Sequence, residues 1–264
     1  MSRIRKHIAG VIFAVLLAAC LTAAYMGGAA ARKPLVCTGL SIEVADSAAN
    51  RFVTAADVKK YLDKEYPEYM GMPLCSLDLA EIERIVDGKS AVKKSQAYTA
   101  RDGKLHVSVT QREPVVRFQK GQQGIYADSR GFLFPLQSSY ASHVQIVDGD
   151  IPLNISGNFK GTPQTEEEQL WLKRMTELVN FMEDSRIWKD KIVQITVDRN
   201  GDLTLIPRKG NERFLFGSPT EIKEKFSKME LYYRGIADKT EGGYRSVDLR
   251  FADQIVCRHD NRNK

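Results

Sequence analysis

The spacing of hydrophobic positions changes several times along the chain, and each change predicts a different kind of element. Residues 246–260, SVDLRFADQIVCRHD, place Val247, Leu249 and Phe251 in alternation with polar side chains, and a second short apolar run follows. Alternation with a period of two is typical of a strand with one buried face. We therefore expect the chain to end on strands, with no later segment to cover the last of them.

Residues 36–113 show a pattern typical of a small α+β unit. Helical spacing of apolar residues begins after Thr54 and again after Asp78, and each start has an acidic residue three positions later, as in a capping box. Asp102-Gly103 is a tight hairpin signal. The expected strands are 36–44, 91–100 and 104–110. The predicted order is strand, helix, helix, strand, strand.

Pro114 interrupts this pattern and marks a boundary, beyond which strands dominate. The expected strands are 115–119, 125–128, 132–135, 144–147, 191–198, 202–207 and 212–217. A helix is predicted over 165–184, where three glutamates suit the positive end of the helix dipole. A second helix is predicted to start at Ser218, with Pro219 in its first turn and Glu221 closing a capping box. The second part is therefore expected to be a mixed sheet with packing helices.

Residues 8–31 contain no charged side chain. A helix of this length reaches about 36 Å, and the hydrocarbon core of a bilayer is about 30 Å thick. The stretch therefore predicts one transmembrane helix. Arg3, Arg5 and Lys6 precede it, which favours an N-terminus in the cytoplasm and places the rest of the chain outside.

Two other fates of this stretch stay open. Leu17–Cys20, LAAC, is similar to a lipobox that would make Cys20 a lipidated N-terminus, and Ala29–Ala31 could serve a signal peptidase. The apolar run continues beyond Cys20 and is longer than an ordinary secretory segment, which favours the retained helix. In all three interpretations, the rest of the chain is exported from the cytoplasm.

Composition and charge narrow the class of protein. The 264 residues, 43% of them hydrophobic and 27% charged, are globular in composition, and the net charge of +6 is mild. Lys and Arg do not interleave with aromatic residues along one element, so a nucleic-acid surface is not expected. Cys20, Cys37, Cys75 and Cys257 form no CxxC pair, so zinc is not expected. Cys37 and Cys75 could form a disulfide or remain thiols.

The sequence offers little support for catalysis. It contains no HExxH, GxSxG, SxxK, GxxxxGK or GxGxxG motif. Cys257 and His259 would share one face of a strand, so an exported thiol hydrolase is one alternative, although no third group that would orient the pair is evident. We expect no enzyme activity, no catalytic residue, no metal site and no cofactor.

Five motifs, in this order behind one apolar stretch, carry a resemblance to a known family. They are QREPVVRF (111–118), GIYADSRGFLFP (124–135), IPLNISG (151–157), FLFGSPTEIKEKFSKM (214–229) and YRSVDLRFADQIVCR (244–258). The chain resembles the FtsQ/DivIB family of bitopic bacterial cell-division proteins over nearly its whole length. The resemblance implies a cytoplasmic tail (1–7), a transmembrane helix (8–31), a POTRA domain (32–113), a β-domain (114–258) and a charged tail (259–264).

The same resemblance implies a function. The chain would be a single-pass scaffold in the bacterial inner membrane at the division site, holding the FtsB and FtsL complex among other division proteins. In the family FtsB docks on the last strands by adding a strand, which would explain why the chain ends on one. The matching positions are Phe251, Ala252, Asp253, Gln254, Ile255, Val256 and Cys257. Some relatives carry a glycine-rich turn and a tryptophan here, so side-chain contacts do not transfer.

Two further points complete the expectations. Arg199, beside the Asn200-Gly201 turn, is a weaker candidate for binding an acidic partner residue, and a solvated turn residue is the alternative. A POTRA-bearing envelope assembly or secretion component is the second candidate class of protein. It is disfavoured because no long series of amphipathic strands follows residue 114.

Overall fold

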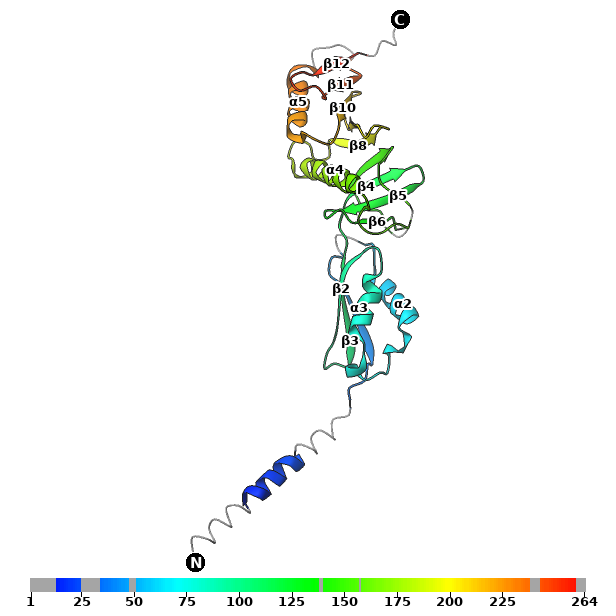
Figure 1. Ribbon diagram of the computed structural model, residues 1–264, viewed down its shortest axis with the longest axis vertical. Coiled ribbons are helices and arrows are strands. Elements are labelled where there is room, and N and C mark those ends of the chain that lie inside the picture. The colour runs from blue at the N-terminus through cyan, green and yellow to red at the C-terminus, as the bar shows by residue number, and fades with distance from the viewer. Residues whose placement is uncertain are drawn as a thin grey trace, which may run out of the picture.

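The computed structural model describes residues 13–24, 34–47, 51–137, 140–156, 158–237 and 243–259. Two folded units follow one another along the long axis of the molecule (Figure 1). Each unit has its own sheet, one of three strands and one of nine. Each unit packs two helices of more than one turn on a sheet that contains both parallel and antiparallel pairs, so the fold class is α+β, as predicted.

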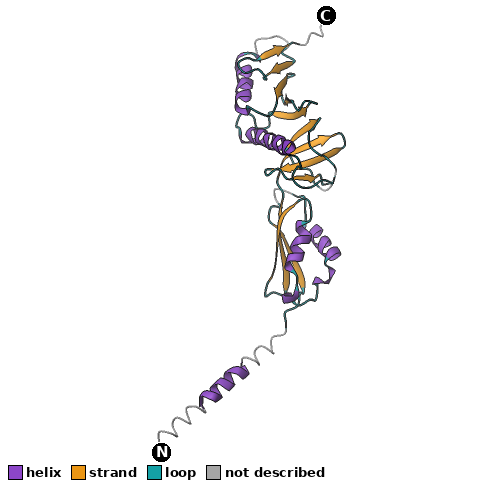
Figure 2. Cartoon of the chain, viewed as in Figure 1, coloured by secondary structure: helices purple, strands orange, loops and turns teal. Residues whose placement is uncertain are grey.

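The first unit has the predicted order of strand, helix, helix, strand, strand. Its elements are β1 (Gly39–Val44), α2 (Ala55–Glu65), the 3₁₀ turns η1 (Pro67–Tyr69) and η2 (Leu74–Ser76), α3 (Leu79–Asp87), β2 (Val92–Thr99) and β3 (Lys104–Gln111). The sheet order is β1-β3-β2, with β1 parallel and β2 antiparallel to β3. Both helices lie on one face of the sheet (Figure 2).

Local capping chemistry starts both helices of this unit where the sequence predicts. The Thr54 hydroxyl accepts a hydrogen bond from the amide of Asp57 at 3.2 Å, and the Asp57 carboxylate accepts one from the amide of Thr54 at 2.9 Å. Asp78 accepts one from the amide of Glu81 at 3.0 Å. These bonds satisfy amides that have no partner within the helix, typically stabilising it by about 1 kcal/mol each.

The second unit is a mixed sheet with packing helices, as predicted. Its elements are β4 (Pro114–Lys120), β5 (Gln123–Asp128), β6 (Leu133–Pro135), β7 (Gln145–Gly149), α4 (Glu166–Asp184), β8 (Ile192–Val197), β9 (Leu203–Pro207), β10 (Arg213–Gly217), α5 (Ile222–Gly235), β11 (Ser246–Asp248) and β12 (Val256–Arg258). The sheet order is β12-β11-β10-β9-β8-β7-β4-β5-β6. Helices α4 and α5 lie on one side of this sheet (Figures 1 and 2).

The predicted start of the last helix is wrong. Helix α5 begins at Ile222, and Glu221 precedes it with a left-handed φ of 54° and no side-chain cap. Ser218 instead belongs to a turn, in which its main-chain oxygen accepts hydrogen bonds from the amide of Thr220 at 2.8 Å and from Nζ of Lys225 at 2.9 Å. The Ser218 hydroxyl, which would have capped a helix, lies 2.8 Å from the Thr220 hydroxyl instead.

The predicted transmembrane helix is only partly covered by the structure. Residues 13–24 are helical, whereas residues 8–12 and 25–31 lie outside the described residues, as do the expected cytoplasmic tail and all but His259 of the charged tail. Within the described ranges, no helix combines the length and the apolar character needed to cross a bilayer. The four cysteines are free thiols, so the Cys37–Cys75 disulfide that the sequence left open is not formed.

An aromatic cluster joins the two units. The ring of Phe52, from the first unit, meets Tyr126, Phe134 and Tyr140 of the second at centroid distances of 5.5, 5.8 and 4.9 Å. Beside it, Arg112 binds the Asp128 carboxylate at 2.9 Å. Phe52, Tyr126 and Phe134 are buried, so the hydrophobic core is continuous across the junction.

Candidate partner-binding edge

Strand β12 forms one rim of the nine-stranded sheet (Figure 1). It pairs antiparallel with β11, with Val247 opposite Cys257 and Asp248 opposite Val256. Strand β11 in turn lies parallel to β10, a pairing that requires the crossover through α5. No strand among the described residues pairs with the outer side of β12.

Two other sheet rims are closed by the protein's own groups. At β2, the amides of Ser95 and Ala97 donate to the carboxylates of Asp87 (2.6 Å) and Glu83 (2.9 Å) on α3. At β6, Leu133 exchanges two main-chain hydrogen bonds with Gly161, of 2.8 and 2.9 Å. The fourth rim, β1, carries no strand among the described residues on its outer side. The covering of the β2 and β6 rims protects the two sheets from unwanted pairing with another chain.

The side chains of β12 divide between the two faces of the sheet. Ile255 and Cys257 are partly buried and pack against the core of the second unit. Val256 is half-buried and Arg258 is exposed, and alternation places both on the opposite face. An added strand would therefore meet the Val256 and Arg258 side chains and a rim of main-chain groups.

An ion-pair network fixes the turn between β11 and β12. The guanidinium of Arg250 donates to the carboxylate of Asp248 at 2.9 and 2.7 Å and lies 3.5 Å from that of Asp202. Asp248 has a side chain only 2% exposed. The hydrogen bonds from Arg250 lower the pKa of Asp248, outweighing burial, and the same contact raises the pKa of Arg250.

A buried lysine holds the same turn from the helix side. Nζ of Lys228 on α5 donates to the main-chain oxygen of Phe251 at 2.7 Å and pairs with Glu224 at 2.8 Å. Buried cations need such partners because desolvation of the charge is costly. The turn is therefore anchored on both sides, and β12 starts from a defined position.

Cys257 and His259 do not form a catalytic arrangement. Burial raises the pKa of the Cys257 thiol, which is the opposite of what a reactive thiolate requires. The His259 ring packs instead against Tyr244, with centroids 4.4 Å apart. Within the described residues, no group of three or more His, Cys, Asp or Glu side chains could hold a metal ion.

The residues predicted to bind a partner occupy two different settings. Phe251, which is 45% exposed, lies with Ala252–Gln254 in the exposed turn, and Ile255 leads into the strand. Only Val256 and Cys257 belong to β12 itself. Arg199 is 94% exposed and lies 3.9 Å from Asp150.

Sequence reasoning did not single out the residues that position this edge. These residues are Lys228, Asp248 and Arg250, which hold the turn before β12. The signal for two of them was present, because Asp248 and Arg250 are two residues apart in a strand pattern and so share one face. Nothing in the sequence connects Lys228 with Phe251, 23 positions later.

The fold defines a class of two-unit proteins in which a small α+β unit precedes a large mixed sheet with β12 at one rim. Comparison with protein families agrees. A family described as FtsQ/DivIB, C-terminal related, matches residues 113–258, and a POTRA-like domain matches residues 35–110. The chain belongs to the FtsQ/DivIB family and is a division-related protein with a POTRA-like domain. No curated protein matches the chain.

Proposed function

We propose that this protein is a division scaffold that recruits and holds the FtsB and FtsL complex by strand addition at β12. The observation that carries the proposal is the position of β12, which is the last strand of the sheet and has no strand among the described residues on its outer side. The anchored turn before it supports the same role, because a preformed edge loses less conformational entropy on binding.

The chemistry of recognition follows from the edge. The main-chain groups on the outer side of β12, which are those of Cys257, would pair with an incoming extended segment and supply much of the affinity. Val256 would offer an apolar contact and Arg258 a positive charge, so the added strand is expected to carry an acidic residue opposite Arg258. The exposed ring of Phe251 adds apolar surface at the start of the edge.

The proposal includes a membrane anchor and a place in the cell. Residues 8–31 would be a retained transmembrane helix in the bacterial inner membrane, with residues 1–7 in the cytoplasm and residues 32–113 and 114–258 outside it at the division site. The protein would act by binding, with no reaction of its own. The mature mass of the purified protein tests the anchor, because cleavage after Ala31 or lipidation at Cys20 would change it.

Amide hydrogen exchange tests strand addition directly. The full chain in detergent micelles is compared with and without the extracytoplasmic part of FtsB. Exchange is expected to slow at Cys257, because its amide faces away from β11 and becomes paired. Slowing confined to β1, or to no strand at all, would contradict docking at β12.

A proline substitution gives a second measurement. Cys257→Pro removes the β12 amide that faces away from β11 and is expected to weaken FtsB binding about tenfold or more. The matched variant is Ala97→Pro in β2, where the outer amide already donates to Glu83 of the same chain. It is expected to leave FtsB binding unchanged. Circular dichroism establishes that both variants retain the fold, and equal loss of binding in both would count against the proposal.

A further inference from the structure

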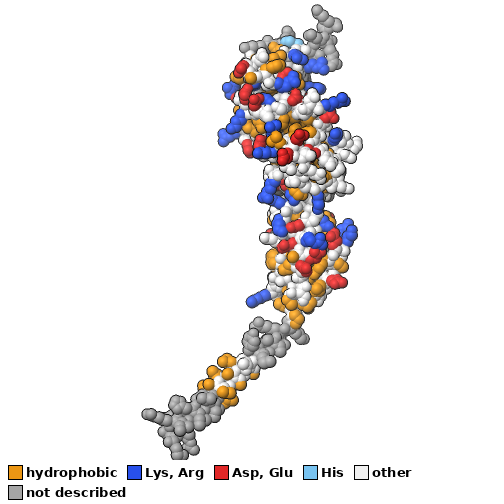
Figure 3. All heavy atoms as spheres, in the orientation of Figure 1, with side chains coloured by type: hydrophobic (Ala, Val, Ile, Leu, Met, Phe, Trp, Pro, Cys, Tyr) orange, Lys and Arg blue, Asp and Glu red, His pale blue; other side chains and the backbone are white. Residues whose placement is uncertain are grey.

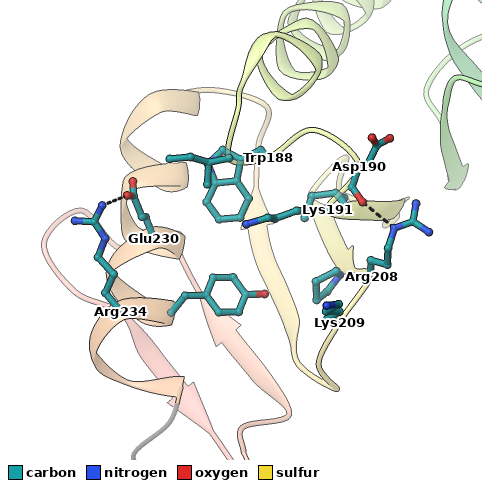
Figure 4. A pocket seen from close by; sticks show the side chains of 11 residues that line it. Trp188, Asp190, Lys191, Arg208, Lys209, Glu230 and Arg234 are labelled. Carbon is teal, nitrogen blue, oxygen red and sulfur yellow. Dashed lines mark hydrogen bonds and ion pairs between the residues drawn. The ribbon is translucent and has the colours of Figure 1, made fainter.

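A cavity of about 520 Å³ lies in the second unit, beside α5 (Figure 4). Its walls come from the segment that joins α4 to β8, from the end of β9 and from α5. In the sheet order, β8 and β9 are separated from β12 by β10 and β11. The cavity and the β12 edge could therefore be occupied at the same time.

The inner wall of the cavity is aromatic. Trp188 is 4% exposed, and its ring lies 6.3 Å from that of Tyr233, centroid to centroid. The Tyr233 hydroxyl donates to the buried carboxylate of Glu212 at 2.9 Å. Burial first, and then Glu212, raise the pKa of Tyr233, so the phenol stays neutral at physiological pH. Ile187, 42% exposed, lies at the mouth.

Hydrogen bonds within the protein shape the walls of the cavity. Oγ of Ser185 accepts hydrogen bonds of 3.2 Å from the amides of Ile187 and Trp188 and so shapes the segment after α4. Nε of Arg208 donates to the main-chain oxygen of Asp190 at 2.8 Å, where the backbone adopts a left-handed φ of 60°. A preformed pocket of this size is typical of sites that hold one large apolar group.

Positive charge predominates around the mouth. Lys191, Arg208, Lys209 and Arg234 line it together with two acidic residues, Asp190 and Glu230. Glu230 is already paired with Arg234, as Figure 4 shows. Lys191 extends below Trp188, its ammonium 6.0 Å from the centre of that ring (Figure 4). An occupant that carries carboxylates would complement this rim.

We propose that this cavity is a second docking site, which takes an acidic segment of a partner protein with one large apolar side chain flanked by carboxylates. The apolar side chain enters between Trp188 and Tyr233, and the carboxylates meet Lys191 and Lys209. The inference does not depend on strand addition at β12, since the two sites share no residue.

The probe is a fluorescein-labelled peptide, acetyl-Asp-Glu-Leu-Phe-Glu-Asp-amide, titrated with the full chain in neutral detergent micelles and followed by fluorescence anisotropy. Two control peptides replace Leu-Phe by Ser-Ser or the four acids by lysines. The acidic apolar peptide is expected to bind about tenfold or more tightly than either control, because the cavity and the rim must both be satisfied. Comparable binding of the three peptides would overturn the proposal.

Charge-reversal variants test whether the acidic apolar peptide binds at this cavity. The variant Lys191→Glu with Lys209→Glu is expected to lose about tenfold or more in affinity for the acidic apolar peptide. The matched control, Lys60→Glu with Lys93→Glu, makes the same change of charge at exposed lysines of the first unit and should bind as the unaltered chain does. Equal loss in both variants would mean a non-specific charge effect and would overturn the site.

Two other occupants are distinguished by the same variants. Self-association of the chain in analytical ultracentrifugation that disappears only in Lys191→Glu with Lys209→Glu would assign the cavity to a second copy and overturn the proposal. So would binding to vesicles with anionic headgroups, lost in the same variant, without binding of the peptide. Cys257→Pro is expected to leave peptide binding unchanged, which separates this site from the β12 edge.

Discussion

Lys228 on α5 donates a hydrogen bond of 2.7 Å to the main-chain oxygen of Phe251, in the turn that leads into β12. Lys228 is buried, and its ammonium also pairs with Glu224. A helix that connects two neighbouring strands, β10 and β11, thus also holds the start of the strand beyond them. The contact between α5 and this turn therefore helps to fix the position of the open edge.

Replacing Lys228 with Met keeps most of the apolar stem and removes the donor. The free energy of unfolding is expected to fall by about 1–3 kcal/mol, because a hydrogen bond from a charged group is lost and the Phe251 oxygen loses its partner. Urea unfolding measures the loss, and amide exchange at residues 251–258 is expected to become faster. Lys223→Met, at an exposed position of the same helix, should change neither. Similar effects of both substitutions would refute the anchoring role.

Asp248 should make the free energy of unfolding depend on pH. Its pKa is lowered in the folded protein, so its contribution is present above the unfolded value of about 3.9 and is lost as pH falls through the lower folded value. Asp248→Asn is therefore expected to cost about 1–3 kcal/mol at pH 7. The difference from the unaltered protein should shrink toward pH 2.

Urea unfolding at pH 7, 4 and 2.5 measures this difference. Asp253→Asn makes the same change in the exposed part of the turn and serves as the control. Its difference from the unaltered protein is expected to stay small at all three values of pH. A difference for Asp248→Asn that does not vary with pH would show that the Arg250 contact does not depend on the charge of the carboxylate.

Phe52 should couple the two units. Phe52→Ala removes a buried ring that meets Tyr126, Phe134 and Tyr140, and such truncations cost about 3–5 kcal/mol. Calorimetry is expected to show one unfolding transition for the unaltered chain and two for Phe52→Ala. Tyr98→Ala removes a half-exposed ring of the first unit and should leave one transition. A single transition in Phe52→Ala would mean that the junction does not make the units cooperative.

Gly149 should tolerate no side chain. It has a φ of 97°, and an added Cβ would lie 2.2 Å from the main-chain oxygen of Val197 in the neighbouring strand. Gly201 has a similar φ of 81° but open space around it. Gly201→Ala is expected to cost about 1–2 kcal/mol from backbone conformation alone. Gly149→Ala should cost more than about 4 kcal/mol, because the strands must also separate. Equal losses in urea unfolding would contradict the close approach of β7 and β8.

Much of the fold was predictable because the signals are local. Thr54 and Thr165 start helices through capping boxes that involve residues three positions away. The Asp102-Gly103 turn joins two strands that pair with each other. The prediction at Ser218 was wrong because Glu221 has a left-handed φ of 54°, which a residue in the first turn of an α-helix does not adopt.

The sequence by itself determined the type and order of most elements, since apolar periodicity and capping depend on residues close together in the chain. Only the tertiary structure decided which rims of the sheets are closed, because Asp87 reaches Ser95 and Gly161 reaches Leu133 through folding of the intervening chain. The same holds for the cavity beside Trp188, whose walls come from segments brought together by packing of α5 on the sheet. Such contacts depend on distance in space, and no periodicity along the chain encodes them.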